Sequence, residues 1–148
     1  MVLAVMDTTA GAYKIVLVLH IIFVVVAFGG LFCAPMLSRV EGAAGSVAKG
    51  MVGYVQRIAI PAVILAGLMG FALIGMSNKE FEFSQAWVGP AILLWLIEIG
   101  LFFGGILPAE KKVAEGDASA AKLLGMFTGI SHLILLVVVF LMVFKPGA

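Results

Sequence analysis

Four long apolar runs set the first constraint on this chain. They cover residues 9–37, 51–76, 86–107 and 123–144. A helix needs about 20 mostly apolar residues to cross the hydrocarbon core of a bilayer. Inside lipid only helices and closed barrels satisfy the backbone hydrogen bonds, and these runs are too long and continuous for barrel strands. The sequence therefore predicts four transmembrane helices and no other type of element.

Composition supports an integral membrane protein with one domain. Of the 148 residues, 64% are hydrophobic and only 11% are charged, which is far from the usage of soluble proteins. The net charge of +1 gives no sign of nucleic-acid binding. The joins between the runs are short and polar, and short joins make neighbouring helices antiparallel. We therefore expect an all-α, up-down bundle of four transmembrane helices over residues 1–148, with Pro61 kinking the second helix.

The basic residues predict an orientation in the membrane, because cytoplasmic joins carry an excess of Lys and Arg. Six basic residues lie in or beside the first and third joins, and three lie at the termini and in the middle join. The six are Arg39, Lys49, Arg57, Lys111, Lys112 and Lys122, and the three are Lys14, Lys79 and Lys145. Both termini should therefore lie on the non-cytoplasmic side of the membrane.

Three ionisable residues interrupt the apolar runs: His20, Glu98 and His132. Such residues are costly in lipid, and they commonly mark functional sites. The helical rise of about 1.5 Å per residue places His20 about 16 Å below the outer face of the bilayer, and Glu98 and His132 about 18 Å below it. All three should lie at one level near the midplane, as a shared buried site requires.

Each histidine shares a helix face with small residues, because positions three, four and seven apart lie on one face. Small residues let another helix or a flat macrocycle approach closely. These residues are Ala27 and Gly30 beside His20, and Gly125 and Gly129 beside His132. The alternative for the glycine pair is a plain helix-packing motif. A second pair, Gly100 and Gly104, points away from Glu98 and suggests self-association or membership of a larger complex.

Two imidazoles at one level predict a b-type haem held between His20 and His132, since neutral imidazole is a good iron ligand. Glu98 would then orient one ring or relay a proton. Other arrangements stay open: a single histidine ligand, a non-haem iron site made of all three residues, or helix–helix hydrogen bonds alone. In the last case Glu98 is a neutral carboxyl held by a backbone carbonyl or by Ser131.

Arg57 has two interpretations. It lies at the inner end of the second run, four residues before Pro61. It is either a charged anchor that reaches the membrane surface or the partner of an anion such as a haem propionate.

The first run, YKIVLVLHIIFVVVAFGGLFCAPML, resembles the first helix of the HemJ-type protoporphyrinogen oxidases. The matching residues are His20, Gly30, Leu31, Phe32, Pro35 and Leu37, and the Lys145–Pro146 ending is also similar. The resemblance implies an integral membrane haem protein with His20 as a ligand, and protoporphyrinogen IX as the substrate. The last helix and the residues after Trp87 depart from that pattern, which favours a related branch of small four-helix bacterial membrane proteins. The implied location is the bacterial inner membrane.

Three functional hypotheses follow. The first is a small b-type haem protein with a redox role, either in electron transfer or as a subunit of a larger membrane complex. The second is a HemJ-like oxidase acting on a porphyrinogen, with an acceptor such as a quinone. The third is an accessory subunit without a cofactor, whose polar residues only join helices. The partners expected are the lipid bilayer, a second copy or larger complex, and a quinone or tetrapyrrole.

Overall fold

The computed structural model describes residues 11–41 and 45–147, with the backbone alone for residues 35–41. All secondary structure in these residues is helical, which confirms the all-α prediction. Residues 9 and 10 of the first predicted run lie outside the described residues. The elements are α1 (Gly11–Glu41), α2 (Ser46–Tyr54), η1 (Val55–Ala59), α3 (Ile60–Met76), α4 (Val88–Leu101), η2 (Phe102–Ile106), α5 (Leu107–Ala114) and α6 (Ala118–Phe144).

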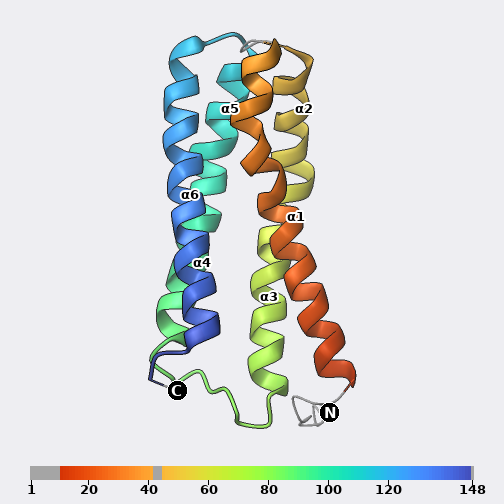
Figure 1. The fold of residues 1–148 in the computed structure, drawn as a ribbon, viewed down its shortest axis with the longest axis vertical. Coiled ribbons are helices and arrows are strands. Elements are labelled where there is room, and N and C mark those ends of the chain that lie inside the picture. The colour runs from red at the N-terminus through yellow and green to blue at the C-terminus, as the bar shows by residue number, and fades with distance from the viewer. Residues whose placement is uncertain (1–10, 42–44, 148) are drawn as a thin grey trace.

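These elements make four long helices in an up-down bundle (Figure 1). The chain continues as helix from α2 through η1 into α3, and from α4 through η2 into α5. Four helices are long and apolar enough to cross a membrane: Gly11–Ala34, Ser46–Met76, Val88–Ala114 and Ala118–Phe144. The start of α1, residues 77–87 and the end of α6 lie at one end of the bundle, here called the pocket end. The opposite end, formed by α2, α5 and the start of α6, is called the closed end.

The helices extend further at the closed end than the apolar runs predict. The third helix continues to Ala114 rather than residue 107, and the fourth begins at Ala118 rather than residue 123. Lys, Glu and Ala after residue 107 are good helix formers, so the helix continues past the end of the apolar run. The turn between them uses Gly116 at φ +94° and the Asp117 carboxylate, which accepts a hydrogen bond from the Ser119 N–H at 2.9 Å. Hydrogen bonds from Ser119 hold the pKa of Asp117 below its usual value.

Two π turns interrupt the long helices, each two residues before a proline. The η1 turn ends at Ala59 before Pro61, and η2 ends at Ile106 before Pro108. Proline lacks an N–H and its ring clashes with the carbonyl four residues earlier, so the α-helical hydrogen-bond pattern cannot be maintained there. A π turn lets the helix continue through that point by inserting an extra residue.

The π turns also build the centre of the core. Val55 and Ala59 from η1, and Phe102 and Ile106 from η2, are fully buried. They pack with Ala27, Phe28 and Leu31 of α1 in one cluster. The Phe102 ring meets the Phe28 ring edge-on, with centroids 5.9 Å apart. This cluster fills the bundle interior between the closed end and the pocket end.

Two close contacts between an aromatic ring and a glycine join the helices. The Tyr54 ring occupies the space that a Cβ on Gly30 would need, and its hydroxyl donates to the Val26 carbonyl and accepts from the Gly30 N–H at 3.0 Å. The Trp95 indole lies against Gly67 in the same way, and its N–H donates to the Val63 carbonyl at 2.8 Å. The first contact joins α1 to α2, and the second joins α3 to α4.

Replacing Gly67 by Ala tests the second contact. The added Cβ overlaps the Trp95 ring, and overpacking of this kind costs about 1–3 kcal/mol. We expect the free energy of unfolding in detergent micelles to fall by about that amount. Gly75→Ala is the matched control, because Gly75 lies on the same helix with open space where its Cβ would be. Equal stability of the two variants would contradict the contact.

Candidate functional site

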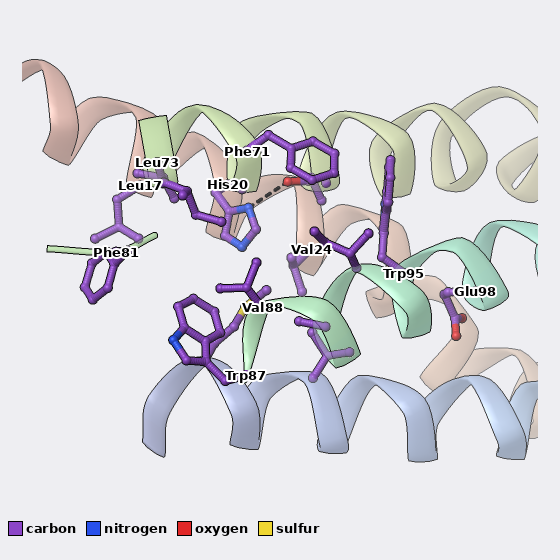
Figure 2. A pocket seen from close by; sticks show the side chains of 18 of the residues that line it. Leu17, His20, Val24, Phe71, Leu73, Phe81, Trp87, Val88, Trp95 and Glu98 are labelled. Atoms are coloured by element: carbon purple, nitrogen blue, oxygen red, sulfur yellow. Dashed lines mark hydrogen bonds between the residues drawn. The ribbon is translucent and has the colours of Figure 1, made fainter. Parts of the chain in front are cut away.

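An elongated cavity of about 340 Å³ lies inside the pocket end of the bundle. Its walls come from α1, α3, α4 and α6, and most of the side chains that line it are apolar (Figure 2). Aromatic rings from Phe71, Phe81, Trp87 and Trp95 contribute to these walls. Pockets for small molecules are typically about 300–1,000 Å³ and mostly apolar, with few polar groups that orient the ligand. This cavity has those properties.

His20 is the polar side chain at the middle of the pocket (Figure 2). Only 8% of its surface is exposed. Its Nδ1 atom lies 2.7 Å from the Ala66 carbonyl oxygen on α3. A carbonyl can only accept, so in the neutral ring Nδ1 carries the proton and Nε2 keeps its lone pair. Figure 2 shows the ring projecting into the pocket with this second nitrogen turned away from α3.

Gly70 leaves room beside the His20 ring. A Cβ at this position would lie 3.5 Å from His20 Cε1, which is ordinary van der Waals contact. The imidazole is therefore held by its hydrogen bond to α3 without being covered by a larger side chain at Gly70. One nitrogen is fixed by the backbone, and the other is available to a ligand.

Glu98 lines the same pocket, at the end away from Phe81 and Trp87 (Figure 2). Its surface is 2% exposed, and its Oε1 atom accepts a hydrogen bond from the Ser131 hydroxyl on α6. The contact with Ser131 confirms one of the partners expected from the sequence. The other oxygen, Oε2, is buried and makes no hydrogen bond in the described part of the chain. The structure thus brings His20 and Glu98 to one cavity.

The mouth of the pocket carries polar groups that the sequence reasoning missed. Tyr13 and Glu80 line it together with Lys145, whose ammonium lies 3.8 Å from the centroid of the Phe81 ring. Lys145 has a left-handed backbone conformation (φ 43°) where α6 ends. Tyr13 begins the first apolar run and Glu80 lies in a polar join, so neither stood out from its surroundings. Tyr13, Glu80 and Lys145 line one pocket because the start of α1, residues 77–87 and the end of α6 all lie at the pocket end.

His132 lies elsewhere. It does not line the pocket; its ring stacks on Phe32 with centroids 3.9 Å apart and 9° between the planes. Phe32 is twelve residues beyond His20, which is about 18 Å along α1. The structure therefore does not place the two histidines as a pair around one ligand. The reason is helix rotation, because Ser131 takes the position that faces Glu98 and the next residue points about 100° away.

His132 also has an unusual environment of its own. Its Nε2 atom is buried and makes no hydrogen bond among the described residues. The same residues contain no group of three or more His, Cys, Asp and Glu side chains that could hold a metal ion. The alternative of a non-haem iron site made of His20, His132 and Glu98 is therefore not formed in the described residues.

The small residues beside the histidines do not line the pocket either. Ala27 is fully buried in the core, and the Tyr54 ring covers Gly30. Gly125 and Gly129 are exposed, with open space where a Cβ would be. None of these positions is therefore available to a ligand between the helices, and nothing in the described residues lies within reach of a Cβ at Gly125 or Gly129.

Arg57 and the second glycine pair face outward. Arg57 is exposed on η1 and does not line the pocket. This position favours the interpretation as an anchor over that as the partner of a buried anion. Gly100 and Gly104 are exposed as well, whereas Glu98 is buried, so these glycines point away from Glu98 as the helical spacing predicts.

No protein-family model matches the chain, and neither a curated protein nor a solved structure matches it. The resemblance to HemJ-type oxidases stays a prediction from the residues quoted above. The features that bear on function are the pocket, the fixed imidazole of His20 inside it and the polar groups at its two ends.

Proposed function

We propose that this chain is a membrane redox protein that binds a b-type haem in the pocket, with His20 as its single histidine ligand. The observation that carries the proposal is the hydrogen bond from His20 Nδ1 to the Ala66 carbonyl. Histidines that bind metals commonly donate their other ring N–H to a carbonyl or carboxylate, which fixes the tautomer and the ring orientation. His20 has that arrangement, with its second nitrogen in an apolar cavity.

The walls and mouth of the pocket support the same ligand class. Apolar and aromatic side chains suit a flat macrocycle, and Lys145 at the mouth suits the anionic propionates of haem. Lys145 thus replaces Arg57 as the proposed cation partner. A volume of about 340 Å³ is at the small end of the range for ligand pockets, so a macrocycle held here would extend beyond the cavity.

If a haem is bound, His20 would hold it as the one histidine ligand from the pocket. The identity of the axial ligands and the polarity of the pocket tune the reduction potential of a haem. This arrangement fits a role in electron transfer, either with a quinone dissolved in the bilayer or within a larger membrane complex. The exposed helix faces around Gly100, Gly104, Gly125 and Gly129 offer surfaces for such a complex.

A HemJ-like oxidation of protoporphyrinogen IX is the second candidate. One observation favours it: His20 and Lys145, which carry the resemblance at opposite ends of the sequence, line the same pocket. The substrate of that reaction is itself a tetrapyrrole, so it would use the same apolar walls. Growth of a strain that lacks its own protoporphyrinogen oxidase, when it expresses this chain, separates the second candidate from the first. A colourless protein that restores no growth would instead favour the accessory subunit.

We also propose that the protein lies in the bacterial inner membrane with its pocket end on the non-cytoplasmic side. The basis is the distribution of Lys and Arg, because four of the basic residues, Lys49, Lys111, Lys112 and Lys122, are exposed toward the closed end.

Replacing each histidine by Ala tests the single-ligand arrangement. His20→Ala should lose the haem absorption bands of the purified protein, because it removes the nitrogen in the pocket. His132→Ala is the matched control and should keep the band positions of the wild type, because His132 does not line the pocket. Visible difference spectra in detergent provide the measurement. The single-ligand proposal fails if His132→Ala removes the bands as well, or if His20→Ala leaves them unchanged.

Replacing Lys145 by Gln tests the proposed contact with a propionate. The side chain keeps nearly its length and loses its charge, and an exposed ion pair is worth up to about 1 kcal/mol. We expect haem to bind about fivefold more weakly, as measured by transfer to an apo-haem acceptor protein. Lys79→Gln is the control, since Lys79 is exposed at the same end and does not line the pocket. An equal loss of affinity in both variants would show a general charge effect.

Reporter fusions test the orientation. Alkaline phosphatase is active only outside the cytoplasm, so a fusion after residue 148 should be active and one inserted in the turn at residues 115–117 should be inactive. The reverse pattern would overturn the proposed orientation and leave the pocket geometry unaffected.

A further inference from the structure

Six polar side chains are buried in the described part of the chain: His20, Ser77, Glu98, Glu110, Thr128 and Ser131. Ser77 has a local role, because its hydroxyl bonds to the Ile74 and Phe81 backbone at the end of α3. The other five lie in the interior of the long helices. Since buried polar groups are costly in a membrane protein, their arrangement calls for a physical reason.

The π turn brings the two buried glutamates to one face of their helix. Glu98 and Glu110 are twelve residues apart, and in a regular α-helix they would point about 120° away from each other. The η2 turn lies between them and inserts one extra residue. The remaining eleven residues make about three full turns, so the carboxyls share a face and lie about 16 Å apart along the axis.

Both carboxyls are left incompletely bonded in the interior. Each glutamate is 2% exposed, and one oxygen of each, Oε2 of Glu98 and Oε1 of Glu110, makes no hydrogen bond in the described residues. Buried polar atoms are normally paired, and an unpaired one costs about 1–3 kcal/mol. Apolar side chains would fill these positions at lower cost, so stability alone does not account for two such groups on one face.

Two hydroxyls on α6 lie beside this face. Ser131 donates to Glu98 Oε1, and Thr128 is three residues nearer the closed end, about 4.5 Å along the helix. Thr128 is buried, and its hydroxyl donates to the Leu124 carbonyl at 2.9 Å. Gly105 and Phe127 keep α6 close to η2, because a Cβ on Gly105 would lie 3.1 Å from the Phe127 ring. The hydroxyls thus continue the polar strip from Glu98 toward Glu110.

We propose that Glu110, Thr128, Ser131 and Glu98 form a proton-transfer route between the closed end of the bundle and the pocket, which Glu98 lines. Each step moves one proton from a carboxyl toward a carboxylate, and a hydroxyl passes on its own proton as it receives another. Thr128 and Glu110 are about 12 Å apart along the helix axis, so several transient water molecules must complete the route between them.

Four lysines of the closed-end helices are exposed: Lys49 of α2, Lys111 and Lys112 of α5, and Lys122 of α6. Lys111 and Lys112 follow the buried Glu110 directly in the sequence, so solvated groups begin within one residue of the carboxyl that would take up the proton. The proposal rests on the proposed function in one respect only, which is that a redox ligand in the pocket would consume the protons. The route itself depends on Glu110, Thr128, Ser131 and Glu98.

The test measures protonation of Glu98 from one side of a vesicle. The protein carries a C-terminal affinity tag, and vesicles are separated into those with the tag inside and those with the tag outside. With the tag inside, the closed end faces the external buffer, because the C-terminus lies at the pocket end. After an external pH step, the infrared band of the protonated Glu98 carboxyl is followed over time. The variant Glu98→Gln assigns that band.

Glu110→Gln should slow the response of Glu98 by about tenfold or more in tag-inside vesicles, and should leave the response in tag-outside vesicles unchanged. Thr128→Val, which replaces the hydroxyl by a methyl group, should also slow the response of Glu98 in tag-inside vesicles. This variant provides the test if Glu110→Gln does not fold. Glu115→Gln is the matched control, since Glu115 is exposed at the same end of the helix.

Two results would overturn the route: a wild-type rate in both Glu110→Gln and Thr128→Val, or no Glu98 response in wild-type tag-inside vesicles. The readout needs no coloured ligand. A colourless protein with a fast Glu98 response would therefore refute the haem proposal and keep the route.

Discussion

One apolar cluster at the level of the two π turns separates the solid part of this bundle from the pocket. Val55, Ala59, Phe102 and Ile106 have no exposed surface and belong to this cluster together with Phe28 of α1. Protein interiors pack at high density, so no ligand fits at this level. Beyond the cluster, side chains of α1, α3, α4 and α6 line the cavity. The position of the pocket thus follows from two proline-linked irregularities in the helices.

Within the pocket, the chemistry depends on how one imidazole is held. The Ala66 carbonyl bonds His20 Nδ1, so the protonated nitrogen is committed to the protein and the other remains for a ligand. His132 is similar in sequence context, but it stacks on Phe32 and stays outside the cavity. The contrast between the two histidines is the basis for the single-ligand proposal.

Glycines of this chain show that small residues in apolar helices have more than one role. Gly67 and Gly30 are each covered by an aromatic ring that also donates a hydrogen bond to a backbone carbonyl on the neighbouring helix. Gly125 and Gly129 face open space instead. The spacing of Gly125 and Gly129 matches a helix-packing motif. Spacing shows which residues share a helix face, but it does not show what lies opposite that face.

The sequence by itself determined the all-α class, the four spans and their antiparallel order, because apolar length and short joins leave few alternatives in lipid. It also identified His20 and Glu98 as unusual and named Ser131 as a partner for Glu98. Only the tertiary structure decided the rest. Helix rotation turned His132 toward Phe32, and the η2 turn placed Glu110 on the face of Glu98. A shift of one residue rotates a helix by about 100°, and that rotation depends on packing between helices, which no single segment encodes.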